Sequence, residues 1–210
     1  MEKVDKKDHI LNIAEKVFAE LGYEGASTRI LAKEAGVNMA MLNYYFGSKD
    51  GLLRAVLERR VASMGTALAD VKNKKVSSWE KLAEAVDMYL DRVLSNNCFQ
   101  KLIHRELSLT KRTEMGEYVT DAILINLTTF SNIIKEGISN GTFRDVDVEL
   151  TVASIFGTKT YLVNSTRIAS KLLKMDIDDP EVIENEIKPR VKKHLHDFLK
   201  AHLTKHDIQI

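Results

Sequence analysis

The chain has few of the residues that crosslink small domains or interrupt helices. Its 210 residues include one cysteine and two prolines. The single cysteine, Cys98, excludes an intramolecular disulfide and a multi-cysteine metal site, and it fits a reducing cytoplasm. The first ten residues, MEKVDKKDHI, lack an apolar stretch, so we expect no signal peptide. No apolar run approaches the roughly 18 residues of a membrane span, and we expect a cytoplasmic protein with no membrane partner.

Charge of one sign is lacking as well. The 31 Lys and Arg residues nearly balance the 30 Asp and Glu residues, which leaves a net charge of +1 and no overall basic signal for nucleic acid. A neutral body can still bind DNA through a local basic face, above all as a dimer. No cysteine or carboxylate completes a zinc set with the six histidines, so we expect no metal and no cofactor.

The chain does show helical periodicity. Apolar residues recur at spacings of three and four, and no segment carries the signal of a strand. The pattern predicts helices at about 8–21, 28–35, 39–46, 48–71, 77–95, 99–109, 114–139 and 181–203, and one that begins at 145 or 147 and ends at about 174. The predicted fold class is therefore all-α, with about nine helices. We assign residues 1–50 to an amino-terminal domain and 51–210 to a carboxy-terminal one; the long helix at about 48–71 connects them, and a polar run at 72–75 ends it.

Residues 28–50, TRILAKEAGVNMAMLNYYFGSKD, carry the most specific motif. A short helix ends at Gly36, Asn38 follows as a helix cap, and a second short helix begins. Ser27 and Thr28 are suited to cap the first of these helices, and Gly22 is suited to end the preceding helix in the left-handed conformation. This is the layout of a helix-turn-helix, whose second helix can enter the major groove of DNA.

The motif resembles the DNA-binding domain of the tetracycline-repressor (TetR/AcrR) family, specifically so over residues 8–55. The family pattern, T-x-x-x-I-A-x-x-A-G-V-S-x-x-x-L-Y-x-Y-F-x-S-K-E-x-L, is matched at Ser27, Leu31, Ala32, Ala35, Gly36, Val37, Leu42, Tyr45, Phe46, Ser48, Lys49, Asp50 and Leu52. Residues 141–147, GTFRDVD, resemble a turn before the eighth helix of such proteins. The resemblance implies an amino-terminal three-helix DNA-binding domain and a carboxy-terminal helical domain for ligand binding and dimerisation.

Two positions depart from the family pattern. Asn43 replaces the usual Tyr, and an asparagine amide can pair with an adenine edge. Gly51 replaces the usual Glu, which removes a capping box with Ser48. We therefore expect a soft start to the fourth helix, and a Gly51→Glu substitution is expected to restore the box and raise thermal stability.

The candidate DNA-binding residues lie within and beside the motif. Arg29 is placed to reach a guanine edge or a phosphate. The exposed side of the second helix is expected to carry apolar groups for thymine methyls, because Leu42 and Phe46 face inward. Lys49 and the tyrosine pair are expected to contact phosphates. The full set is Ser27, Thr28, Arg29, Asn38, Met39, Ala40, Met41, Asn43, Tyr44, Tyr45 and Lys49.

The carboxy-terminal region supplies candidates for a ligand pocket and a dimer interface. Its large apolar side chains favour a pocket for a partly apolar small molecule, although an ordinary helical core would use them equally well. The predicted pocket set is Met88, Phe99, Ile103, His104, Tyr118, Phe130 and Tyr161. Small residues at 153–158 would let another helix approach closely. The predicted interface set is Ala153, Ser154, Gly157, Thr158, Ile187, Val191, Leu195 and Phe198; intramolecular packing is the alternative.

These features predict a homodimeric, ligand-responsive, sequence-specific DNA-binding transcriptional regulator. The resemblance implies a repressor that a small-molecule effector releases from a near-palindromic double-stranded DNA operator. The alternative is a helical small-molecule-binding or scaffold protein without DNA readout. An enzyme is not expected, because no nucleophile–base pair, phosphate loop or metal set is recognisable.

Overall fold

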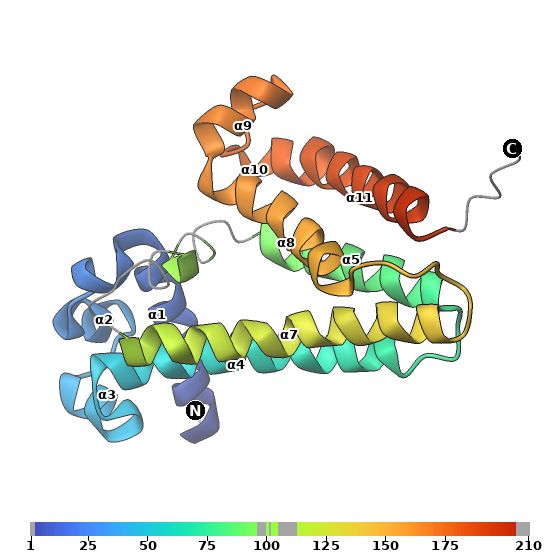
Figure 1. Ribbon diagram of the computed structural model, residues 1–210. Helices are drawn as coiled ribbons and strands as arrows, with labels where there is room; N and C mark the ends of the chain where they lie inside the picture. The colour runs from blue at the N-terminus through green and yellow to red at the C-terminus, as the bar shows by residue number, and fades with distance from the viewer. Residues whose placement is uncertain (1–2, 96–99, 101, 105–112, 205–210) are drawn as a thin grey trace, which may run out of the picture. The chain divides into compact units, whose positions relative to one another are not determined.

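A computed structural model describes residues 3–95, 100, 102–104 and 113–204, whose regular structure is entirely helical (Figure 1). The all-α prediction is confirmed. The chain forms two compact units: unit 1 comprises Met1–Ser63 and Cys98–Ile123, and unit 2 comprises Met64–Asn97 and Leu124–Ile210. Two long helices, α4 (Lys49–Lys72) and α7 (Thr113–Ser139), each belong to both units. The predicted boundary after residue 50 stays a prediction.

Unit 1 is built on α1 (Lys3–Gly25), α2 (Thr28–Glu34), α3 (Met39–Phe46) and the first part of α4. The apolar face of α1 packs against α2 and α4 around the fully buried Phe18, Leu31 and Leu53. Leu102 and Val119, from the middle of the chain, are buried in the same core. Unit 1 is therefore completed by residues that lie far away in the sequence.

The end of α1 differs from the prediction at Gly22. Its φ of 69° is positive as expected, but its ψ of 174° is extended rather than left-handed helical, and one further turn continues to Gly25. Glycine tolerates this conformation because it has no Cβ. The kink brings the Tyr23 ring parallel to the Phe18 ring, with their centroids 6.1 Å apart.

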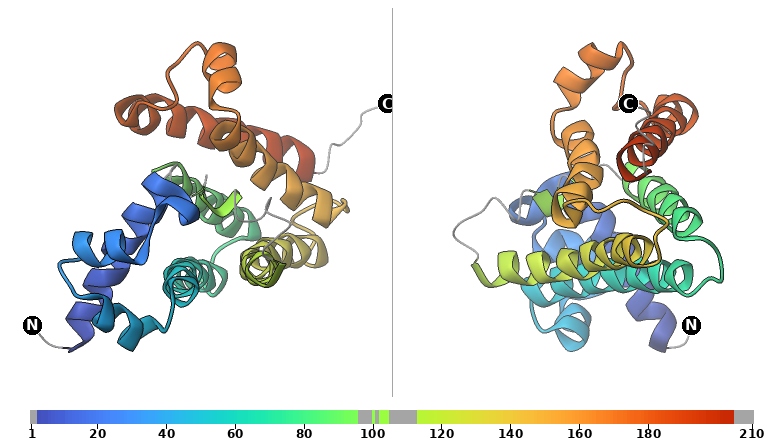
Figure 2. Two further views of the ribbon diagram at one scale, coloured as in Figure 1. Left: turned by 90° about the vertical axis from the view of Figure 1, so that its left-hand side faces the viewer. Right: turned by 45° about the vertical axis from the view of Figure 1, so that its right-hand side comes forward.

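Unit 2 contains α5 (Ser78–Leu94), α8 (Val148–Asn164), α9 (Thr166–Leu173), α10 (Pro180–Val182), the π-helical segment η1 (Ile183–Ile187) and α11 (Lys188–Leu203). Both α8 and α11 pack on α5, and the second halves of α4 and α7 lie side by side (Figures 1 and 2). The rings of Tyr89, Phe130 and Phe156 meet at the centre, with centroids 4.4 to 5.9 Å apart.

The turn at 140–147 shows why its glycines are needed. Gly141 has a φ of 79°, and a Cβ at Gly137 would overlap the Phe143 ring. The Phe143 N–H donates to the Gly137 carbonyl at 2.9 Å, and the Arg144 N–H donates to the Leu203 carbonyl at 2.9 Å. The turn is thereby fastened to the end of α11.

Two predicted helices are altered. The helix predicted from 145 or 147 to 174 breaks at Ser165, whose φ of −119° and ψ of 42° are not helical. The helix predicted at 181–203 is present, but it starts with a π-helical turn. There Lys188, only 5% exposed, donates to Ser95 Oγ at 2.6 Å and also to Glu184. The helix predicted at 99–109 lies largely outside the described residues, although 102–104 are helical.

In the described part of the chain, no helix combines the length and apolar character needed to cross a membrane. The same residues contain no group of three His, Cys, Asp or Glu side chains placed to hold a metal ion.

Candidate nucleic-acid interface

Both short helices of the motif are capped as predicted. The Ser27 Oγ accepts the Ile30 N–H at 3.2 Å, and the Asn38 Oδ1 accepts the Met41 N–H at 2.8 Å. Between them Gly36 has a φ of 63°, which ends α2 and turns the chain into α3. Since its side-chain oxygen is used by the cap, Asn38 fixes the start of α3.

One side of α3 faces solvent. Tyr44 is 69% exposed and Met39 is 48% exposed, while Ala40 and Asn43 also lie on the surface. Leu42 is buried and anchors the helix in the unit 1 core. This exposed side is the surface that a major groove would meet.

The prediction placed Met41 on that same side, and this is wrong. Met41 is half-buried and packs against the unit 1 core, as does Tyr45. Met41 lies one turn before Tyr45 on nearly the same face of α3, and that face turns toward the core. The Tyr44 and Tyr45 rings contact each other edge to face, with centroids 5.2 Å apart.

The remaining predicted residues flank α3. Arg29 is exposed in the first turn of α2, and Thr28 beside it is half-buried. Lys49 Nζ donates to the Tyr23 carbonyl at 2.9 Å and lies 3.9 Å from the centre of the Tyr23 ring. The Tyr23 hydroxyl donates to Asp50 at 3.0 Å. Lys49 and Asp50 thus hold the start of α4 onto the last turn of α1.

Gly51 has a steric role that the sequence did not reveal. Ser48 Oγ accepts its N–H at 3.0 Å, which caps α4. A Cβ at Gly51 would overlap the Phe46 carbonyl oxygen at the end of α3. The expectation that Gly51→Glu stabilises the protein is therefore wrong: the close approach of two backbones requires glycine here.

Two family models, one for each part of the chain, match the sequence along most of its length. Residues 10–56 match the sequence model of bacterial regulatory proteins of the tetR family. Residues 79–188 match that of the tetracyclin repressor-like C-terminal domain. The chain belongs to the TetR family. It is a helical, DNA-binding transcription regulator, and α3 lies within the residues that match the first of these models.

Proteins of similar sequence or structure match most of the chain. The HTH-type transcriptional repressor NicS of Pseudomonas putida is 29% identical over 182 residues, which cover 83% of this chain and 84% of that protein. The structure of the fatty acid degradation regulator FadR from Bacillus halodurans has a TM-score of 0.73 at 24% identity, covering 95% of this chain and 99% of that one. FadR from Bacillus subtilis in complex with stearoyl-CoA gives a TM-score of 0.71 at 22% identity, covering 89% and 96%.

The residues predicted to line a ligand pocket are divided between the two units. Met88, Phe130 and Tyr161 belong to unit 2, whereas Ile103, His104 and Tyr118 belong to unit 1, and Phe99 lies outside the described residues. Phe130 is fully buried, and Tyr161 is exposed. Tyr118 packs within unit 1 instead. The centre of its ring lies 5.0 Å from Arg54 Cζ, and its side chain is hydrogen-bonded to Glu58; both partners are on α4.

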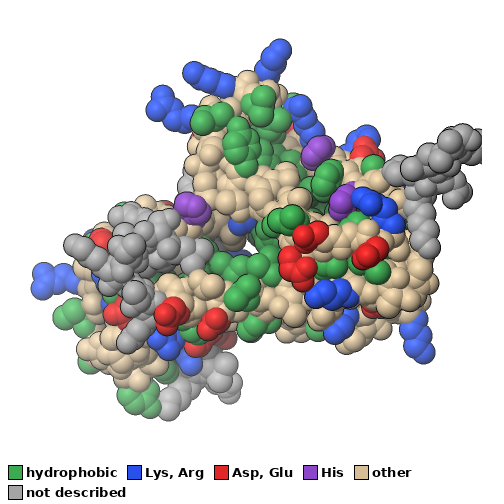
Figure 3. All heavy atoms as spheres, in the orientation of Figure 1, with side chains coloured by type: hydrophobic (Ala, Val, Ile, Leu, Met, Phe, Trp, Pro, Cys, Tyr) green, Lys and Arg blue, Asp and Glu red, His purple; other side chains and the backbone are tan. Residues whose placement is uncertain are grey.

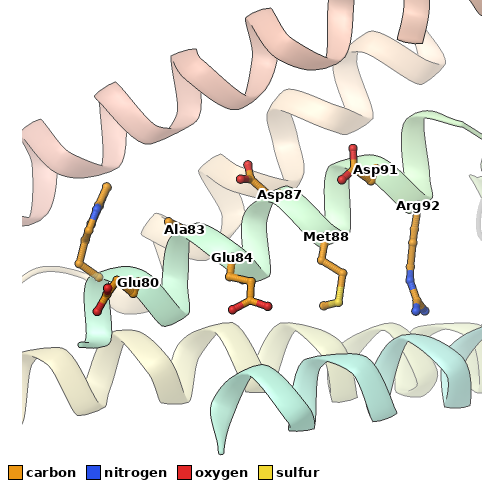
Figure 4. A pocket seen from close by; sticks show the side chains of 8 residues that line it. Glu80, Ala83, Glu84, Asp87, Met88, Asp91 and Arg92 are labelled. Carbon is orange, nitrogen blue, oxygen red and sulfur yellow. The ribbon is translucent and has the colours of Figure 1, made fainter. Parts of the chain in front are cut away.

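A shallow depression of about 540 Å³ on the outer face of α5 includes Met88 from the predicted set (Figure 4). Its lining residues are Trp79, Glu80, Ala83, Glu84, Asp87, Met88, Asp91 and Arg92. The carboxylates here are paired: Asp91 with Lys192 and Glu84 with Lys74, at 2.8 and 2.6 Å. Hydrogen bonds from Ser77 lower the pKa of Glu80. Five of the eight lining side chains are charged, and Trp79, Ala83 and Met88 supply its apolar part.

Three residues of the predicted dimer interface lie inside the chain's own core, and the others stay a prediction. Ile187, Val191 and Leu195 are buried in the unit 2 core, because the apolar stripe of α11 packs against α5. They are therefore not available to a partner, and this part of the prediction is wrong. Ala153, Ser154 and Gly157 lie on the exposed face of α8, with Thr158 half-buried beside them, and Phe198 is exposed on α11.

Proposed function

We propose that the protein is a repressor that binds a near-palindromic operator as a homodimer and leaves it when a small molecule binds. The observation that carries the proposal is the exposed side of α3, fixed by the Asn38 cap within a unit that matches the family's DNA-binding domain. NicS, a transcriptional repressor by its description, supports repression. We further propose that this chain acts in the cytoplasm, where it meets its DNA partner. We propose no catalytic activity and no cofactor for it.

In this proposal α3 reads bases and its surroundings bind phosphates. Asn43 pairs with an adenine edge, Met39 and Ala40 contact thymine methyls, and Arg29 reaches a guanine or a phosphate. Hydroxyl and ammonium groups bind the backbone on both sides. That phosphate set is Ser27, Thr28, Tyr44, Tyr45 and Lys49, with Asn38 and Met41 as supports of α3.

Selection of duplexes from a random-sequence pool, followed by titrations with the recovered duplex, tests this function. Alanine at Arg29 or Asn43 is expected to cost about 1–3 kcal/mol of binding free energy and to relax the base preference. Asn12→Ala, an exposed asparagine on α1, is the matched control. If no duplex is enriched, the alternative of a helical binding or scaffold protein without DNA readout replaces this function.

A second copy of the chain is the proposed partner of the exposed apolar side chains on α8 and α9. Leu150 is 67% exposed, and Ile168 and Leu172 are 62% and 66% exposed. Figure 3 shows hydrophobic side chains gathered near α9 with Lys and Arg side chains around them. The small residues 153, 154 and 157 continue this surface along α8. A dimer would cover it and would present two recognition helices to one DNA face.

The effector is proposed to bind in unit 2, beside the three central aromatic rings. Phe130 of α7 and Phe156 of α8 have centroids 5.2 Å apart. Asn126 lies one turn before Phe130, and Lys159 lies about one turn after Phe156. On the other side of this contact Lys135 of α7 pairs with Glu149 of α8, so the two helices run antiparallel here and both polar residues fall on one side of it.

Both polar groups are unusual for a helical core. Asn126 Oδ1 is buried and has no hydrogen-bond partner among the described residues. Lys159 occupies an inward position of α8 between the buried Ile155 and Val163, and burial lowers its pKa to about 8. Aromatic rings with a cation and an amide suit an amphipathic anion, such as an acyl group that carries a carboxylate or phosphates. The complex of Bacillus subtilis FadR with stearoyl-CoA supports this class.

The measurement is the shift in melting temperature with stearoyl-CoA as the probe. The parent is expected to gain stability with ligand concentration, and Lys159→Gln is expected to lose most of that gain. Lys171→Gln, an exposed lysine on α9, serves as the control. A full shift in the Lys159 variant would remove this residue from the effector site.

The proposed coupling between effector and operator follows α4 and α7, because each helix belongs to both units. In unit 1 these helices are joined by the contacts of Tyr118 with Arg54 and Glu58. By linkage, an effector that weakens operator binding must bind the DNA-free protein more tightly by the same factor, typically about 5–150-fold. Equal affinity of the effector for free and DNA-bound protein would exclude release by this route.

A further inference from the structure

The recognition helix carries no cation of its own. Its eight residues, MAMLNYYF, include neither Lys nor Arg. Most of the affinity of proteins for DNA comes from Lys and Arg groups that neutralise phosphates and release counterions. Lys49, the nearest cation after α3, already donates to the Tyr23 carbonyl and stacks on the Tyr23 ring. Positive charge close to α3, in addition to Arg29 and Lys49, would strengthen the attraction to phosphates.

The amino-terminal turns of α1 supply such charge. Lys7 is exposed and Lys6 is half-buried, both within the first turns of the 23-residue helix. Lys7 Nζ lies 5.9 Å from the centre of the Phe46 ring, and Phe46 is the last residue of α3. This distance is within the range of a cation–π interaction. The start of α1 is thus tied to the end of the recognition helix.

The link continues along α3 to its exposed side. The Phe46 ring lies 6.1 Å from the Tyr45 ring, which in turn contacts Tyr44. Two residues after Lys7, His9 Nε2 lies 3.2 Å from the Ala35 carbonyl at the end of α2. Figures 1 and 2 show the start of α1 projecting at the same end of unit 1 as α3. Lys7 therefore stands beside the helix that would occupy the groove.

We propose that Lys6 and Lys7 form a second DNA-backbone contact, binding phosphates that flank the groove segment read by α3. An α-helix with its side chains is about 10–12 Å wide, and the major groove is about 12 Å wide. A helix that fills the groove has phosphates along both flanks, so a cation held beside one end of α3 meets the backbone. The contact rests on the proposed operator binding and extends its footprint beyond the helix-turn-helix.

The test measures the salt dependence of binding to a duplex selected with the parent protein. Log K falls as log salt concentration rises, and each lost phosphate contact makes this fall less steep by about 0.9. Lys6→Gln and Lys7→Gln are each expected to lower the slope by about 0.9 per half-site and to weaken selected and random duplexes alike. Lys7→Arg is expected to retain the parent slope. Thermal unfolding of each variant confirms that unit 1 remains folded.

Lys16→Gln is the matched control, because Lys16 is an exposed lysine on the same helix. It lies nine residues from Lys7, which is about 13.5 Å along the helix axis. Unchanged slopes in the Lys6 and Lys7 variants, with the parent still binding, would overturn this contact alone. An equal loss in Lys16→Gln would also overturn it, since net charge would then explain the effect. A parent that binds no duplex would overturn the proposed function itself.

Discussion

The substitution Gly51→Ala tests the packing of α3 against the start of α4. The added Cβ would overlap the Phe46 carbonyl oxygen, a backbone atom that cannot rotate away. Phe46 is followed by Gly47, whose N–H donates to the Asn43 carbonyl at 2.9 Å and closes α3. Moving the oxygen therefore means moving the end of α3.

The size of the effect follows from two opposing contributions. Overpacking costs typically about 1–3 kcal/mol, whereas alanine in place of glycine gains up to about 1 kcal/mol of helix propensity. From the middle of the overpacking range, about 2 kcal/mol, the expected net loss is about 1–2 kcal/mol of unfolding free energy. For a chain of this size each kcal/mol shifts the melting temperature by about 2–4 °C, so a fall of roughly 2–8 °C is expected.

Differential scanning calorimetry of Gly51→Ala and Gly116→Ala measures this difference. Gly116 is also helical, on α7, but no atom lies within 4 Å of the position of its added Cβ. Its alanine variant keeps only the propensity gain and should melt slightly above the parent. If Gly51→Ala melts at or above the parent temperature, the backbone at Gly51 does not approach the Phe46 carbonyl closely enough to exclude a Cβ.

Three further predictions concern unit 2. Burial lowers the pKa of Lys159 from 10.5 to about 8, so the unfolded chain binds more protons between these values and the parent gains stability as pH rises through them. Lys159→Met should therefore melt above the parent at pH 7, with a gap that narrows toward pH 10; a constant gap contradicts this. Gly157→Glu should leave the fold of the chain intact, because no atom lies within 4 Å of an added Cβ, but should give monomers in sedimentation. A fully dimeric variant would remove α8 from the interface. Gly137→Ala should lower the free energy of urea unfolding by about 1–3 kcal/mol, because its Cβ overlaps the Phe143 ring; an unchanged midpoint would show that the turn can adapt.

The helix-turn-helix was predictable because its signals are local. Ser27 and Asn38 cap helices three residues ahead, and Gly36 takes a positive φ between them. Each of these interactions joins residues that are near in sequence, so residue type and spacing are enough to predict them. The capping box of Ser77 and Glu80 at the start of α5 has the same character.

The faces of helices were less predictable. An apolar stripe shows that a helix face is covered, but it does not show by what. Leu195 belongs to such a stripe, and α5 of the same chain covers it rather than a second copy. Met41 was misplaced because one helical position changes the direction of a side chain by 100°.

By itself, the sequence determined the all-helical class, the motif at 28–50 and the family, since caps, periodicity and motif spacing are properties of short segments. The tertiary structure alone decided which distant residues meet. It brought Leu102 and Val119 into the core of unit 1, placed Tyr118 against Arg54, and set Gly51 against the Phe46 carbonyl. These contacts depend on how whole helices pack against one another. The residue types and spacings of short segments do not indicate which distant side chains will meet.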